Sequence, residues 1–236
     1  MADTGEKAAS GITVLCGGAM QGLITDAVTL LLPNDRIDVR FGLTSTLRKE
    51  IENGAAFDIA LLPRPDIEAL IRFGRIAEGS DTDTMRSAIG VAVRTGVPKP
   101  RIDTVDAFRR ALREARLITY SDGPSGLYIA GLLDRLGIAA EMKPKTRLTT
   151  GPVAELVAAG EADIGIQQIV AILPVKGAVL VGPLPTELQS IIVYAAGISA
   201  SSANAQAART FIAFLASPEV VRLIRTKGLE PGRAGT

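Results

Sequence analysis

The chain has 236 residues, of which 47% are hydrophobic, so it is long enough to form one large domain or two smaller lobes with buried cores. Its 26 basic and 25 acidic residues leave a net charge of +1, which does not indicate a nucleic-acid or membrane-surface partner. Aromatic residues make up 4% and Trp is absent, which argues against base-stacking or sugar-binding surfaces. The apolar runs are too short to span a membrane, so we expect a soluble chain.

Histidine is absent and Cys16 is the only cysteine. This excludes His-dependent catalytic triads, zinc sites of the usual Cys/His type and an internal disulfide. We therefore expect neither a metal nor a cofactor. The first residues are polar and lack the apolar segment of a secretion signal, so we expect either a cytoplasmic protein or one whose leader was removed.

The first part of the chain alternates apolar and amphipathic segments. We predict strands at 12–16, 37–41 and 58–62, and helices at 19–32, 44–53 and 65–73. Gly54 follows the second helix, where a glycine often ends a helix. Repeated strand–helix units predict an α/β fold with mostly parallel sheets and helices on both faces.

A polar loop at 76–86 separates a second series from the first. In this series we predict strands at 88–93, 117–120, 146–148, 163–167 and 191–195, and helices at 105–114, 125–136 and 153–159. Two final helices follow at 203–216 and 218–226, the second with Ser217 as N-cap and Pro218 in its first position.

The two series predict two lobes. Because two helices remain after the second series has closed, we expect the chain to return, so that residues 1–86 plus 196–236 form lobe I and residues 87–195 form lobe II. In open α/β sheets, ligands bind at the carboxyl ends of the strands. We therefore expect a ligand cleft between the lobes.

Four predicted strand-to-helix joints consist mainly of small residues, at 16–20, 42–46, 123–126 and 149–152. Each presents free backbone N–H groups or hydroxyls at a helix start, where the helix dipole favours an anion. Ordinary capping is the better interpretation of any single joint, and Ser125 is the expected N-cap of the third. Four joints in one chain favour anion binding. Nucleotide binding is not expected, because neither the dinucleotide fingerprint nor the phosphate-binding loop motif is present.

Several segments are similar to the periplasmic molybdate-binding protein family: FGLTSTL at 41–47, EIENGAAFDI at 50–59, PSGLY at 124–128, LVAAGEADIG at 156–165 and FIAFLASPE at 211–219. The resemblance covers nearly all of residues 12–232. It implies a type II periplasmic-binding-protein fold, with two α/β lobes, two chain crossings and one anion in the cleft. It also implies a periplasmic monomer that delivers its ligand to an ABC transporter permease.

The resemblance maps the family's ligand positions onto Ala19, Thr44, Pro63, Ser125, Thr150 and Gln168. Thr44 and Ser125 retain donors, whereas Ala19 replaces a serine, Pro63 has no N–H and Gln168 replaces a tyrosine. A tetrahedral oxyanion would lose contacts at each departure. The departures favour an organic carboxylate over molybdate.

Arg64 follows Pro63 at a predicted strand end, where its guanidinium is suited to a planar carboxylate, although a solvated arginine at a helix start is an equally good interpretation. Gln167 and Gln168 offer amide donors and acceptors. The predicted binding residues are Gly18, Ala19, Met20, Thr44, Ser45, Pro63, Arg64, Ser125, Gly126, Thr150, Gly151, Gln167 and Gln168.

A second resemblance is to a branch of the same superfamily that includes aconitate isomerase. It is carried by VPKP at 97–100, YSDGPSGLY at 120–128, GIQQI at 165–169 and ILPV at 172–175. This branch implies an allylic proton shift on a tricarboxylate, which requires a base. Tyr120, Tyr128 and Asp122 are the candidates, although core packing is the better interpretation of each tyrosine taken singly. We therefore predict a solute-binding protein for a small anion, with an isomerase as the alternative and a cytoplasmic sensor as a third possibility.

Overall fold

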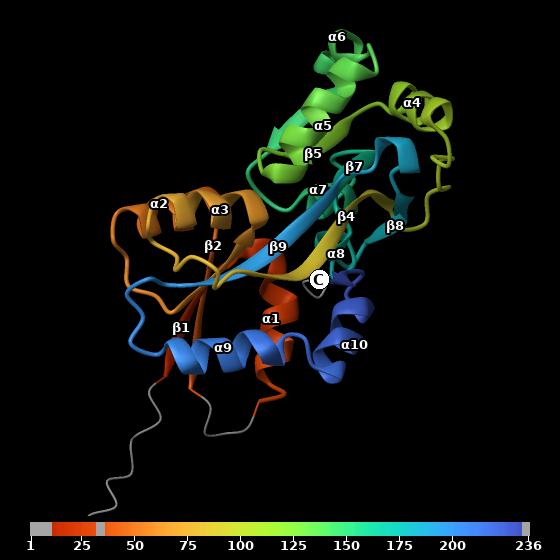
Figure 1. Ribbon diagram of the computed structural model, residues 1–236. Helices are drawn as coiled ribbons and strands as arrows, with labels where there is room; N and C mark the ends of the chain where they lie inside the picture. Colours follow the sequence, from red (N-terminus) through yellow and green to blue (C-terminus); the bar gives the residue numbers. More distant parts are fainter. Residues whose placement is uncertain (1–10, 32–35, 233–236) are drawn as a thin grey trace, which may run out of the picture. The chain divides into compact units, whose positions relative to one another are not determined.

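A computed structural model describes residues 11–31 and 36–232 of the chain (Figure 1). The chain forms two compact units, which we describe separately. Unit 1 comprises the described residues of Met1–Arg86, Val193–Thr226 and Glu230–Thr236, and unit 2 comprises Ser87–Ile192 and Lys227–Leu229. Within the described ranges, no helix is long and apolar enough to cross a membrane.

The sheet of unit 1 is mostly parallel. Strands β2 (Ile37–Gly42), β1 (Ile12–Gly17) and β3 (Ile59–Pro63) run parallel in this order, and β9 (Ile191–Ile198) pairs with β3 in the antiparallel sense. The last residues of β1 and β2 lie opposite each other. The carboxyl ends of the three parallel strands therefore meet at one edge, where three helical segments begin.

Helices cover both faces of this sheet. Because successive strand side chains point to opposite faces, Leu15 and Leu62 lie in a cluster with Leu47 of α2 and Leu70 of α3, whereas Leu61 faces the other way. Figure 1 shows α2 and α3 side by side. The helical segments of unit 1 are η1 (Gly18–Met20), α1 (Gln21–Val28), α2 (Thr44–Glu52), α3 (Arg64–Arg72), α9 (Ala205–Phe214) and α10 (Pro218–Thr226).

Unit 2 has a second mostly parallel sheet. Strands β7 (Ile164–Gln168), β5 (Ile118–Ser121) and β6 (Thr146–Thr149) are parallel in this order, and β4 (Thr82–Arg94) is antiparallel to β7. Strand β8 (Ala178–Pro183) also pairs with β4. The helices are α4 (Val105–Glu114), α5 (Pro124–Arg135), α6 (Ala139–Met142), α7 (Val153–Ala158) and α8 (Ile169–Ile172), with 3-10 turns η2 (Lys143–Lys145) and η3 (Thr186–Leu188).

The prediction of one helix at 19–32 is wrong in its bounds. The structure forms a 3-10 turn and then a helix that ends at Val28, where the Thr29 hydroxyl donates to the Asp26 carbonyl at 2.6 Å. Leu32, the last residue of the predicted helix, lies outside the described residues. The small residues that we interpreted as a helix start are therefore a turn before it.

The polar loop predicted at 76–86 is also partly wrong, because β4 already begins at Thr82. Pairing with β10 (Glu230–Pro231) at Met85 and Arg86 stabilises this extended segment. The Thr84 hydroxyl further donates to the Tyr194 carbonyl at 3.1 Å. These partners are distant in the sequence, so the polar composition gave no sign of them.

Cys16 is completely buried in β1, and burial raises the pKa of its thiol far above the ordinary value.

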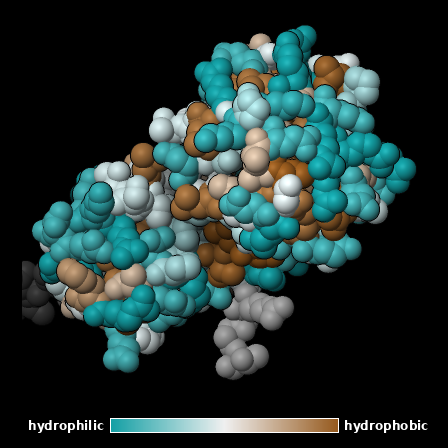
Figure 2. All heavy atoms as spheres, turned by 90° about the horizontal axis from the view of Figure 1, so that it is seen from above, coloured by the Kyte–Doolittle hydropathy of each residue, from teal (hydrophilic) through white to brown (hydrophobic). Residues whose placement is uncertain are grey.

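A few large apolar side chains are exposed on the surface, among them Leu43, Leu127 and Leu148. Figure 2 shows such hydrophobic residues on a mostly hydrophilic surface.

Candidate functional site

In unit 1, the ends of β1 and β2 place a hydroxyl beside a glycine. Helix α2 begins at Thr44, and its N-cap Leu43 provides no side-chain cap. A Cβ atom on Gly17 would lie 3.4 Å from the Thr44 hydroxyl oxygen, so glycine keeps this corner open. Within the described residues the Thr44 hydroxyl makes no hydrogen bond, which leaves it available to a ligand.

The neighbouring predicted residues contribute less. The Met20 side chain is fully buried, so only its backbone can be offered to a ligand. Gly18 and Ser45 are exposed and Ala19 is half-buried. Gly18, Ala19 and Met20 therefore offer backbone groups only, whereas the side-chain donors of this edge are the hydroxyls of Thr44 and Ser45.

Arg64 is already paired. Its Nη1 atom lies 2.7 Å from an Asp81 oxygen, and its Nε atom lies 2.5 Å from an Asp83 oxygen. The three side chains are half-buried and together carry one net negative charge. Pro63, the N-cap of α3, adds no N–H. This corner is consequently less attractive to an anion than the sequence alone indicated.

Tyr194 is a residue of this edge that the sequence analysis missed. It lies opposite Pro63 in the β3–β9 pair and is 2% exposed. A Cβ on Gly17 would lie 3.8 Å from its ring, so the ring lines the same corner as Thr44. The strand prediction at 191–195 included Tyr194, but no sequence signal joined it to Gly17, which is far away in the chain.

In unit 2, the start of α5 requires a glycine. A Cβ atom on Gly126 would lie 1.5 Å from the Ser121 carbonyl oxygen, so no other residue fits there without a backbone shift. The expectation that Ser125 is the N-cap is wrong, because the helix begins at Pro124 and Gly123 is the N-cap. The Gly123 N–H donates instead to the Ser121 hydroxyl at 3.3 Å. The close contact holds the first turn of α5 against the end of β5.

Two polar groups near this edge have no hydrogen-bond partner within the described part of the chain. Gln167 is 6% exposed, and its Nε2 atom is buried and unpartnered. The Ser125 hydroxyl also makes no hydrogen bond there, although the oxygen itself is not among the buried atoms. Because β5 and β7 are parallel neighbours, both residues belong to the carboxyl edge. A buried donor normally has a partner, so a ligand is a physical reason for the Gln167 amide, and the Ser125 hydroxyl is free to contact the same ligand.

The remaining donors lie at the ends of β6 and β7. The Gly151 N–H donates to the Thr149 hydroxyl at 3.0 Å, so this joint is partly satisfied internally. Thr150 is exposed. Gln168 is buried at the end of β7 and is the N-cap of α8. The unit 2 edge thus combines backbone N–H groups with hydroxyl and amide side chains.

The three candidate bases differ in environment. Tyr120 packs in the unit 2 core. Burial, with a further contribution from the Asp134 charge, raises the pKa of its hydroxyl. Less of the basic phenolate therefore forms at neutral pH. The Tyr128 hydroxyl donates to the Leu188 carbonyl at 2.9 Å. Asp122 is exposed at the end of β5, and its N–H donates to the Thr149 carbonyl at 3.2 Å. Asp122 is the most accessible of the three.

Comparisons with known proteins identify the family of this chain. Residues 12–230 match the family model of the bacterial extracellular solute-binding proteins. An aconitate isomerase from Pseudomonas sp is 34% identical over 176 residues, which cover 74% of this chain and 67% of that enzyme.

Solved structures show the same fold. The periplasmic molybdate-binding protein of Azotobacter vinelandii has a TM-score of 0.77 at 19% identity, covering 95% of this chain and 100% of that one. The substrate-binding domain of a molybdenum ABC transporter from Clostridium difficile, described as putative, has a TM-score of 0.74 at 17% identity, covering 93% and 98%. The predicted type II periplasmic-binding-protein fold is confirmed.

Proposed function

The chain belongs to the family of bacterial extracellular solute-binding proteins, and from this premise we propose that it binds a small anion, specifically an organic carboxylate rather than molybdate. The observation that carries the proposal is the Gln167 amide nitrogen, a buried donor without a partner within the described residues, at the same sheet edge as the unpaired Ser125 hydroxyl. Leaving a buried donor unsatisfied costs about 1–3 kcal/mol. A bound ligand that accepts a hydrogen bond from the Gln167 amide would recover this free energy.

The chemistry of the donors supports a carboxylate. Carboxylate oxygens accept hydrogen bonds from hydroxyls, amides and helix N-termini, all of which occur at these strand ends. Ala19 and Pro63 remove two donors that the resemblance implies for a tetrahedral oxyanion. We propose that Thr44 of unit 1 and Ser125, Gln167 and backbone groups of unit 2 contact the ligand.

Family membership supports a role outside the cytoplasmic membrane. We further propose that the protein acts as a monomer and delivers its ligand to an ABC transporter permease.

The 34% identical aconitate isomerase supports a second candidate function. In such a reaction a base removes a proton from one carbon, the double bond moves by one position, and the proton returns to the other end of the allylic unit. Asp122 is the best candidate for that base, because Tyr120 is buried with a raised pKa and the Tyr128 hydroxyl is held by a carbonyl.

Calorimetry with cis-aconitate, trans-aconitate, citrate, molybdate and sulfate tests the proposal. We expect saturable binding of at least one carboxylate and feeble binding of molybdate. Tight molybdate binding, or no binding of any carboxylate, would contradict it.

An ultraviolet assay with cis-aconitate decides between the two functions, since only an isomerase changes the absorbance without an added cofactor. If the protein is an isomerase, Asp122→Asn should abolish turnover while binding persists.

A further inference from the structure

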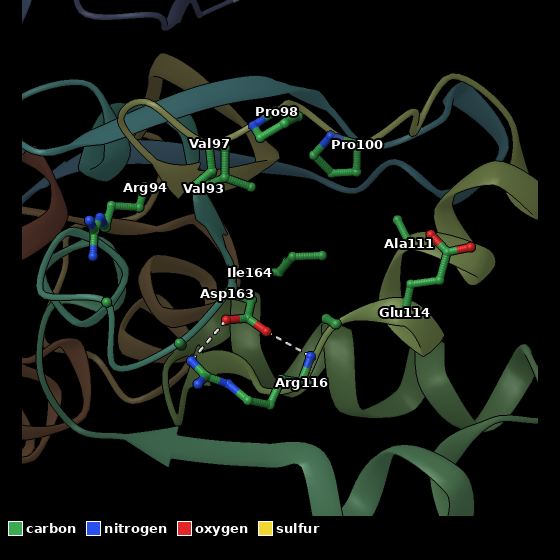
Figure 3. A pocket seen from close by; sticks show the side chains of 13 residues that line it. Val93, Arg94, Val97, Pro98, Pro100, Ala111, Glu114, Arg116, Asp163 and Ile164 are labelled. Carbon is green, nitrogen blue, oxygen red and sulfur yellow. Dashed lines mark hydrogen bonds and ion pairs between the residues drawn. The ribbon is translucent and has the colours of Figure 1, made fainter.

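Unit 2 contains a pocket at the edge opposite the helix starts (Figure 3). Its volume is about 380 Å³, within the range of small-ligand sites. Arg116 and Asp163 line it and lie just before β5 and β7, so the pocket lies at the amino ends of these strands. The candidate anion site described above lies at their carboxyl ends.

Two opposite charges flank this pocket without partners. Neither the Arg94 guanidinium nor the Glu114 carboxylate makes an ion pair or side-chain hydrogen bond within residues 11–31 and 36–232. Arg116 is different, since its guanidinium lies 3.2 Å from an Asp163 oxygen. Figure 3 shows Arg94 and Glu114 on opposite sides of the pocket.

The guanidinium of Arg94 lies close to the backbone of Gly160. A Cβ atom on Gly160 would lie 2.9 Å from its Nη1 atom. Gly160 has a φ of 76°, which suits glycine at this position. The guanidinium is exposed and makes no ion pair within the described residues, so it is accessible to a ligand carboxylate.

The wall between the two charges is apolar and stiff. Val97, Pro98 and Pro100 form it, and the side chain of Val97 is 43% exposed. Each proline fixes its own φ, and the Lys99 ammonium donates to the Leu180 carbonyl at 2.7 Å, which ties the segment to β8. An apolar wall with a cation at one end and an anion at the other matches a ligand with charged ends and an apolar middle.

We propose that this pocket binds a short free peptide with an apolar side chain. The carboxyl end of the peptide pairs with Arg94, its amino end pairs with Glu114, and its side chain packs on Val97. Arginine binds carboxylates through two parallel hydrogen bonds, and glutamate accepts from an ammonium group. The proposal is independent of the anion bound at the helix starts.

The test uses the tripeptide Ala-Leu-Ala with free ends, its N-acetylated form and its C-terminal amide. Calorimetry should show at least tenfold weaker binding for both modified peptides. Arg94→Gln should weaken binding of the free peptide at least tenfold but leave binding of the C-terminal amide unchanged. Glu114→Gln should likewise weaken binding of the free peptide at least tenfold but leave binding of the N-acetylated peptide unchanged. Arg110→Gln and Glu155→Gln, exposed residues outside the pocket, are the matched controls and should change nothing.

Amide NMR signals locate the binding. Peptide-induced shifts should concentrate at Val97 and Gly160 and spare Ser125 and Gly126. No binding at millimolar peptide, equal loss in the control variants, or shifts at the helix starts instead would overturn the proposal. Full affinity of the acetylated peptide would also overturn it, since the pocket would then recognise only a carboxyl terminus.

Discussion

The helix starts of the two units offer an anion different chemistry. In unit 1 the Thr44 hydroxyl stands beside backbone groups, Pro63 has no N–H, and two aspartates occupy the guanidinium of Arg64. In unit 2 the buried Gln167 amide nitrogen and the Ser125 hydroxyl have no hydrogen-bond partners within the described residues. We therefore expect substitutions at the unit 2 edge to change anion binding more than substitutions at the unit 1 edge.

Gly126→Ala should have the largest effect. The added Cβ would overlap the Ser121 carbonyl, so the first turn of α5 must move away from β5. We expect the free energy of unfolding to fall by on the order of 3 kcal/mol, and anion binding to be lost, because overpacking without room is resolved only by backbone shifts. Urea unfolding and calorimetry measure both effects.

Gly131→Ala is the control for this change, since its nearest neighbour is the flexible end of Arg135 at 3.6 Å. It should raise stability by about 0.5–1 kcal/mol through helix propensity. Equal stability of the two variants would show that the contact at Gly126 does not hold the turn.

Ser125→Ala should weaken carboxylate binding by about 1–2 kcal/mol with little change in stability, because the free protein loses no internal hydrogen bond. Thr119→Val in β5 should show the reverse. It removes a buried hydrogen bond from the Thr119 hydroxyl to the Arg147 carbonyl, 2.8 Å long, and should reduce stability by about 1 kcal/mol with unchanged affinity. Unaltered affinity in Ser125→Ala would assign that hydroxyl no part in recognition.

Substitutions of Arg64 and Asp83 test how the charges of unit 1 affect carboxylate affinity. The sequence alone predicts that Arg64→Gln lowers carboxylate affinity by about 2–4 kcal/mol. Because Asp81 and Asp83 hold the guanidinium and all three side chains are partly exposed, we now expect a loss of about 1 kcal/mol. Asp83→Asn should strengthen binding by a similar amount, and high salt should reduce both effects. Changes of the same sign in both variants would rule out this charge effect.

Thr44→Val should have the smallest effect, about 0.5 kcal/mol of affinity, because the hydroxyl is only half-buried and is readily replaced by water. Calorimetry of Thr44→Val and Ser125→Ala with the same ligand compares the two losses of affinity directly. A larger loss from Thr44→Val than from Ser125→Ala would reverse the roles given to the two units.

Local sequence signals predicted most of the fold. Helices α4 and α10 begin and end where their periodicity and flanking residues indicate, and the Ser217 hydroxyl accepts from the Val220 N–H at 3.4 Å as expected of an N-cap. The elements not predicted are short or depend on distant partners. Helices α6 and α8 have four residues each, too few to show a period, and β10 exists through its pairing with β4.

The candidate site was less predictable than the fold. The small residues at the joints indicated where backbone is exposed, and the strand order places those joints together at the sheet edges. However, the partners of Arg64 come from a segment 17–19 residues later, which we predicted as part of a polar loop. Side-chain pairing of this kind depends on the path of the loop, which composition does not reveal.

The buried thiol of Cys16 makes the protein convenient to label. Its sulfur is inaccessible and its pKa is raised, so the reactive thiolate is scarce under native conditions. Cysteines introduced on the surface, one in each unit, would therefore react with spin labels or fluorophores without the removal of Cys16. Such a doubly labelled protein would report directly, by the distance between its labels, how the two units respond to each anion in turn.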